Sequence, residues 1–92
     1  MRREKMMERV PQGWSRELKN GVYVLTRTFK FDDFTQAMAF ASRVGEAANA
    51  ADHHPEITVS WGKVRVDWWS HDAKGVTARD ISLAETTTRL YS

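Results

Sequence analysis

The chain has 92 residues, of which 41% are hydrophobic and 28% charged, and its formal net charge is +2. This composition is typical of globular proteins, and the length suits one hydrophobic core, so we expect a single domain over residues 1–92. The basic residues are scattered among carboxylates, which argues against a nucleic-acid partner. The absence of cysteine excludes disulfides and thiolate metal sites.

The first residues, Met1–Lys5, mix both charge signs and lead into no apolar run of signal-peptide or membrane length. We therefore expect no membrane partner and a cytoplasmic location. Residues 2–10 then place Met6, Met7 and Val10 at helical spacing, which predicts a short helix ending before Pro11.

Two extended segments, 14–19 and 22–31, flank the dipeptide Asn20-Gly21, which favours the positive φ angles of a tight hairpin turn. In the second segment the apolar residues share one parity, so one face is expected to be buried. These residues are Tyr23, Leu25, Phe29 and Phe31.

A helix is expected after Asp32 or Asp33, either of which can cap its N-terminus. Its apolar stripe is predicted from residues that recur at steps of three and four: Phe34, Met38, Ala41, Val44 and Ala48. The helix should end near Asp52, because Pro55 disfavours a helical conformation at His54.

A second hairpin is predicted from residues 57–61 and 63–70, turning at Gly62. Val64, Val66 and Trp68 share one face, so His71 should emerge from the opposite, more polar face at the end of the strand. Thr77 and Asp80 have the spacing of a capping box and open a last helix.

This order of elements predicts the α+β class. We expect a four-stranded antiparallel sheet with three helices packed on one face, in the order α-β-β-α-β-β-α. Its open edges favour association into a homodimer or homotetramer.

All three histidines are candidates for chemistry, because imidazole titrates close to neutral pH and both donates and accepts protons. His53 and His54 follow the long helix, and His71 follows the last strand. Acid–base catalysis on a small polar substrate is one interpretation, and ordinary surface histidines are the other. A metal site is disfavoured, since adjacent histidines point apart and no further ligand lies at zinc-site spacing.

Four motifs follow one another along the chain: Gly13-Trp14, Asp52-His53-His54-Pro55-Glu56, Ser70-His71-Asp72 and Gly75-Val76-Thr77 with Asp80. With these motifs in this order, the chain resembles the pterin-4a-carbinolamine dehydratase family, which is also described as a dimerisation-cofactor family. The resemblance implies dehydration of a 4a-hydroxytetrahydropterin to the quinonoid dihydropterin, which supports tetrahydropterin recycling without a metal or organic cofactor.

The resemblance also implies the site. His53 and His71 would be the acid–base pair in either order, and His54 would bind and orient the pterin. Substrate contacts would come from four further residues: Trp14, Asp52, Arg79 and Asp80.

The sequence departs from the family pattern at Asn49, where glutamate is common, at Trp61, and at the bulky pair Trp68-Trp69. A different class of function is also open, because family members stabilise the dimer of a transcription factor without catalysis. A hydroxylase is a further possible partner. The intact histidines favour the enzyme over this interaction module.

Overall fold

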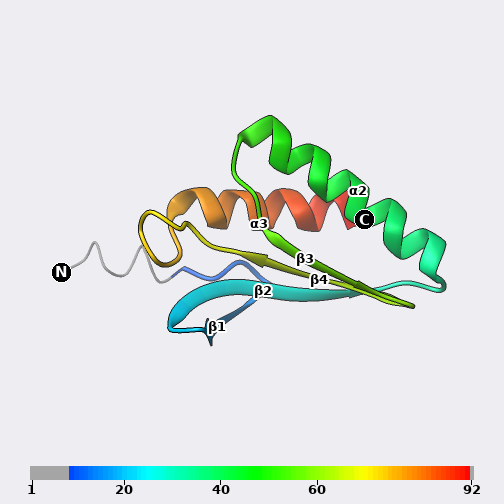
Figure 1. Cartoon of the computed structure of the whole chain (residues 1–92), viewed down its shortest axis with the longest axis horizontal. Helices are drawn as coiled ribbons and strands as arrows, with labels where there is room; N and C mark the ends of the chain where they lie inside the picture. Colours follow the sequence, from blue (N-terminus) through cyan, green and yellow to red (C-terminus); the bar gives the residue numbers. More distant parts are fainter. Residues whose placement is uncertain (1–8, 92) are drawn as a thin grey trace.

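The computed structural model describes residues 9–91, which fold into four strands and two helices (Figure 1). The elements are β1 (Ser15–Lys19), β2 (Val22–Lys30), α2 (Phe34–Ala51), β3 (Glu56–Ser60), β4 (Lys63–Trp68) and α3 (Ala78–Tyr91). The strands form one antiparallel sheet in the order β1-β2-β4-β3, so β1 and β3 are its edges.

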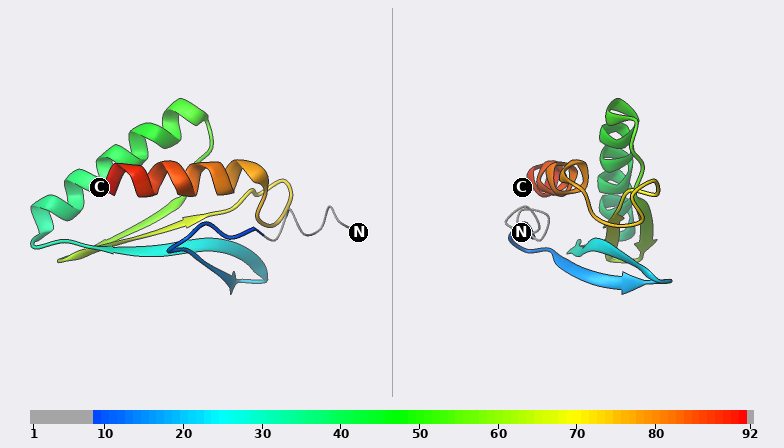
Figure 2. Two further views of the ribbon diagram at one scale, coloured as in Figure 1. Left: turned by 180° about the vertical axis from the view of Figure 1, so that it is seen from behind. Right: turned by 90° about the vertical axis from the view of Figure 1, so that its left-hand side faces the viewer.

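Both helices lie on the same face of the sheet, and no helix of residues 9–91 covers the other face (Figure 2). The predicted α+β class and four-stranded antiparallel sheet fit this architecture. Neither α2 nor α3 is long and apolar enough to cross a membrane.

The prediction of three helices is wrong, since residues 9–91 contain only two. Most of the segment expected to form the first helix, 2–8, lies outside the described residues, and its described end, Arg9 and Val10, is not helical. Pro11 accounts for this end, because proline disfavours the helical conformation in the residue before it. The chain then turns, and the Trp14 amide donates to the Pro11 carbonyl at 3.1 Å.

The turn between β1 and β2 has the conformation that its dipeptide predicts. Asn20 has φ 52° and Gly21 has φ 83°, so both central residues take the positive angles of a tight hairpin turn. The second hairpin turns through Trp61 and Gly62, between the end of β3 and the start of β4. These two short turns set the register of the sheet.

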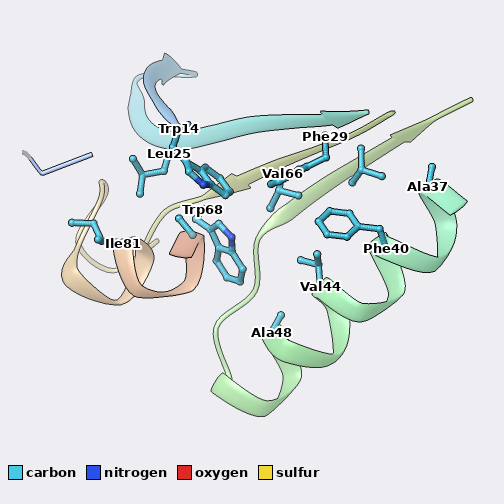
Figure 3. Close-up of a cluster of buried hydrophobic side chains, with 12 residues drawn as sticks. Trp14, Leu25, Phe29, Ala37, Phe40, Val44, Ala48, Val66, Trp68 and Ile81 are labelled. Carbon is cyan, nitrogen blue, oxygen red and sulfur yellow. The ribbon is translucent and has the colours of Figure 1, made fainter. Parts of the chain in front are cut away.

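Helix α2 begins after Asp33, whose Oδ1 accepts a hydrogen bond of 2.8 Å from the Gln36 amide. Its buried stripe differs from the predicted one. Phe34 and Met38 are each 47% exposed, and the residues that face the sheet are Ala37, Phe40, Val44 and Ala48 (Figure 3). Val44 and Ala48 are buried as predicted, so the error is confined to the first half of the helix, where apolar residues lie on two sides and spacing alone indicated the wrong one.

The core lies between the helices and the inner face of β2 and β4, where Leu25, Phe29, Val66 and Trp68 are fully buried (Figure 3). Tyr23, which was predicted to share this buried face, is 47% exposed. Its partner in the register is Leu18, which is itself exposed, so Tyr23 lies at the uncovered hairpin end of β2.

A buried carboxylate lies on the sheet face that has no helix. Asp67 is 1% exposed and accepts hydrogen bonds from Lys19 at 2.6 Å, Thr26 at 2.5 Å and Arg65 at 2.9 Å. Burial by itself would raise the pKa of Asp67, but the hydrogen bonds from these three partners outweigh it and lower the pKa below its ordinary value. Lys19 also pairs with Glu56 on the edge strand β3.

Candidate active site

A cavity of about 790 Å³ lies where the chain leaves α2, where it leaves β4 and where α3 begins. All three histidines line it. The complete lining comprises Asp52, His53, His54, Ser70, His71, Asp72, Ala73, Thr77, Ala78 and Arg79. The fold therefore brings together residues that are separated by up to 27 positions in the sequence.

The end of α2 places His53 and His54 at this cavity. Asp52 takes a left-handed conformation with φ 52°, and its amide donates to the carbonyls of Ala48 and Asn49. This left-handed residue closes the helix, and Pro55 prevents its continuation. Two adjacent histidines are thus held at the helix exit, with His53 partly buried and His54 exposed.

His53 is held by a carboxylate on one side and by an aromatic ring on another. Its Nε2 lies 2.7 Å from Asp80 Oδ1, and its ring stacks on Trp68 with centroids 5.9 Å apart and planes 15° from parallel. Because an ionised carboxylate only accepts hydrogen bonds, Nε2 carries a proton and Nδ1 remains for a ligand. The side chain is 10% exposed.

Asp80 is fully buried and has four hydrogen-bond donors around it. Besides His53, these are the Ser70 hydroxyl at 2.7 Å, the Thr77 amide at 2.8 Å and the Thr77 hydroxyl at 3.0 Å. The Thr77 amide bond is the return bond of a capping box, so the start of α3 and the orientation of His53 share one carboxylate. Asp80, which was predicted to contact substrate, is closed to solvent and does not line the cavity.

The other two histidines have different neighbours. His54 Nε2 lies 2.9 Å from the Asn49 Oδ1 acceptor, which leaves Nδ1 of His54 for other partners. His71 is exposed, and its ring lies against Trp69 with centroids 4.9 Å apart and planes tilted by 30°. The loop that carries His71 is closed by backbone hydrogen bonds between Ser70 and Gly75.

Arg79 and Trp14, both predicted to contact substrate, lie in different surroundings. Arg79 lines the cavity and donates to the carbonyls of Ala51 at 2.9 Å and Asp52 at 3.2 Å, so it ties α3 to the end of α2. Trp14 is 6% exposed in the core, and its indole nitrogen donates to Thr88 at 2.9 Å. It is not among the lining residues, because this bond and its contact with Phe29 hold it inside the protein.

Five lining residues were given no part in the site by the sequence reasoning, and three of them are polar: Ser70, Asp72 and Thr77. Ser70 and Asp72 flank His71, so their sequence position was a usable signal. Thr77 was assigned only to helix capping. Among residues 9–91, no group of three or more histidine and acidic side chains has an arrangement that could hold a metal ion.

The site offers imidazole nitrogens from two separate segments around one open cavity, together with the acidic side chains of Asp52 and Asp72 and the cation of Arg79. Such a set of groups can protonate one atom of a small polar ligand and deprotonate another in the same complex.

Comparisons with known proteins agree on one family. The family described as Pterin 4 alpha carbinolamine dehydratase matches residues 1–90. A protein of Hahella chejuensis is 44% identical over 82 residues, which are 89% of this chain and 72% of that protein. One of Chlorobium luteolum is 42% identical over 88 residues, 96% of this chain and 76% of the relative. Both carry the name "Putative pterin-4-alpha-carbinolamine dehydratase".

Solved structures share the fold. A Brucella melitensis protein described as a transcriptional coactivator/pterin dehydratase superposes with a TM-score of 0.78 at 33% identity, covering 88% of this chain and 84% of that one. A pterin dehydratase-like protein described as a RuBisCO assembly factor has a TM-score of 0.73 at 17% identity, covering 88% of this chain and 92% of its own, and shows the fold alone.

Proposed function

The chain belongs to the pterin 4 alpha carbinolamine dehydratase family, and on this basis we propose that it removes water from a 4a-hydroxytetrahydropterin. The observation that carries the proposal is the meeting of His53, His54 and His71 at one cavity. The products would be quinonoid dihydropterin and water, so the enzyme would be a carbon–oxygen lyase that supports tetrahydropterin recycling.

The reaction breaks the bond between C4a and the hydroxyl oxygen and forms a double bond between C4a and N5. The hydroxyl gains a proton and leaves as water, while N5 loses its proton. One group must therefore act as an acid and another as a base, each contributing roughly 10² to 10⁴ in rate.

His53 suits the base. Asp80 fixes its proton on Nε2, which leaves Nδ1 to take the proton from N5, and the same carboxylate then stabilises the positive charge that the ring gains. His71 comes from the other segment of the cavity wall and would deliver the proton to the departing hydroxyl. His54, held by Asn49, would bind and orient the pterin.

The test is the rate of dehydration of freshly generated 4a-hydroxytetrahydropterin, followed by ultraviolet absorbance, with His53→Ala and His71→Ala as variants. Acceleration by the wild type that is lost in both variants supports the proposal. A folded wild-type protein that gives no acceleration over buffer would overturn it.

The second candidate is a non-catalytic module that stabilises the dimer of a transcription factor. It is favoured by the coactivator description of the Brucella structure. The dehydration assay separates the two, because a module without catalysis predicts no dependence of the rate on any histidine.

We also propose that the chain assembles into a homodimer or homotetramer. Both edge strands, β1 and β3, lack a partner on one side within the described chain, and large apolar side chains are exposed. These include Leu18, Phe34, Met38 and Trp61. Light scattering coupled to size exclusion should give a mass of two or four chains, and a monomer at micromolar concentration would contradict this.

A further inference from the structure

Two successive tryptophans each contact one of the histidines proposed to react. Trp68 stacks on His53, with ring centroids 5.9 Å apart, and Trp69 lies against His71, with centroids 4.9 Å apart. No contact with a ligand is needed to explain either tryptophan, since neither lines the cavity.

The two indoles lie on opposite faces of the sheet, because successive residues of an extended chain point to opposite sides. Trp68, the last residue of β4, is fully buried in the core between the sheet and the helices (Figure 3). Trp69 is partly buried and lies near Lys19. The partner of Lys19, Asp67, belongs to the sheet face that has no helix, which we call the open face. Each face of the sheet thus supports one histidine.

Each indole is itself fixed. The Trp68 nitrogen donates to Thr87 Oγ1 at 3.0 Å in the core. The ammonium of Lys19 lies 6.0 Å from the centre of the Trp69 ring, within the range of cation–π attraction, and a hydrogen bond of 2.6 Å to the buried Asp67 holds this ammonium in place. The buried carboxylate of Asp67 therefore fixes Lys19, which in turn holds the Trp69 ring that contacts His71.

His71 depends on this contact more than the other histidines depend on their ring neighbours. His53 has a hydrogen bond to Asp80 and His54 has one to Asn49. For His71, no side-chain hydrogen bond to any of residues 9–91 fixes the imidazole, and the ring is exposed. A ring that is free to rotate would lose much of the rate that orientation supplies.

We infer that Trp69 is the positioning residue of His71, holding its imidazole at the cavity from the open face of the sheet. The catalytic consequence of this inference rests on the proposed dehydratase function, whereas the ring contact does not. The contact and its consequence are therefore tested separately.

The contact is tested by tryptophan emission between pH 5 and pH 8. A protonated imidazole touching an indole quenches its emission, and histidine takes up its proton in this range. Emission should be measured for the wild type, His71→Gln, Trp69→Phe and the double variant. In the wild-type background, His71→Gln should remove a pH-dependent quenching of the emission. In the Trp69→Phe background this quenching should already be absent, so His71→Gln should have no further effect. The same His71→Gln effect in both backgrounds would overturn the inference.

This cycle isolates one pair among four tryptophans and three histidines. His53→Gln in the same backgrounds reports the Trp68 contact, and its effect should not depend on residue 69. Trp61→Phe is the matched control, because Trp61 is 70% exposed in the turn between β3 and β4. It should leave the effect of His71→Gln unchanged.

The consequence is tested by steady-state kinetics of dehydration. Trp69→Leu should lower kcat by about ten- to a hundredfold with little change in KM, since His71 would be misplaced while the pterin still binds. Trp69→Phe keeps a ring under the imidazole and should recover most of kcat. A Trp69→Leu protein with wild-type circular dichroism and wild-type kcat would contradict a positioning role. If the wild type itself does not dehydrate the pterin, the proposed function fails, and the emission cycle still decides the contact.

Discussion

Asp80 Oδ1 lies 2.7 Å from His53 Nε2, and the same buried carboxylate accepts the amide of Thr77 at the first turn of α3. One side chain therefore caps a helix and fixes the proton of a candidate base. Removing its charge should affect both stability and catalysis, and the two effects are separable by measurement.

Asp80→Asn is expected to lower kcat by roughly 10²-fold or more, because the amide can turn its NH₂ group toward His53 and reverse the protonation of the ring. Kinetics should be measured together with urea unfolding. Glu46→Gln, an exposed acid-to-amide change on α2, is the matched control for the loss of one charge. A folded Asp80→Asn protein with wild-type kcat would show that the carboxylate serves the helix alone.

Asn49→Ala should raise KM and leave kcat nearly unchanged, since His54 would lose the acceptor that orients it for binding. The loss of one hydrogen bond of about 1 kcal/mol corresponds to a change in KM of about fivefold. Asn49→Asp keeps an acceptor at this position and should retain a KM close to that of the wild type. A fall in kcat with constant KM in the alanine variant would instead place His54 in the chemical step.

Protonation of Asp67 should make the protein less stable in acid. The pKa of its carboxyl is lowered in the folded state, although burial alone would raise it, because Lys19 and the other donors favour the charged form. A lowered pKa stabilises the fold fully above the unfolded value of about 3.9, and this contribution is lost as the pH falls through the folded value.

Urea unfolding of the wild type and Asp67→Asn should therefore diverge at pH 6 and converge as the pH is lowered below about 3.9. Asp32→Asn, an exposed change before α2, is the control and should remain parallel to the wild type. A stability difference for Asp67→Asn that does not shrink in acid would show that its cost comes from packing and not from charge.

Trp14→Phe should destabilise the fold without changing KM. The variant loses the indole hydrogen bond to Thr88 and part of the core volume, a cost of about 1–3 kcal/mol in the free energy of unfolding. Chemical unfolding and KM for the pterin are the two measurements. A rise in KM at unchanged stability would instead indicate that Trp14 contacts the substrate, as the family resemblance implies.

Local signals in the sequence predicted most of the fold. The tight turn between β1 and β2 needs two positive φ angles, which Asn20-Gly21 adopts readily, so this dipeptide predicted the hairpin. The aspartates before α2 indicated where the helix begins, and the structure shows that Asp33 is the cap. Local signals failed where apolar residues occur on two faces, as on α2, where Phe34 is exposed and Phe40 is buried. Spacing does not show which stripe meets the sheet.

The sequence indicated several of the residues that line the cavity, but not the contacts between them. The histidines were named from the sequence, and the cavity contains all three. The partnership of Asp80 with His53 spans 27 positions, and that of Lys19 with Trp69 joins β1 to the end of β4. Such contacts depend on strand order, which periodicity and capping signals leave open.

The central claim is that His53 and His71 act together in one dehydration step, and the most direct test compares His53→Gln, His71→Gln and the double variant in that reaction. If both act in the same step, each single variant should lose most of the acceleration, and the double variant should lose little more. Single variants that keep the wild-type rate, or a wild type that does not exceed buffer, would contradict the account.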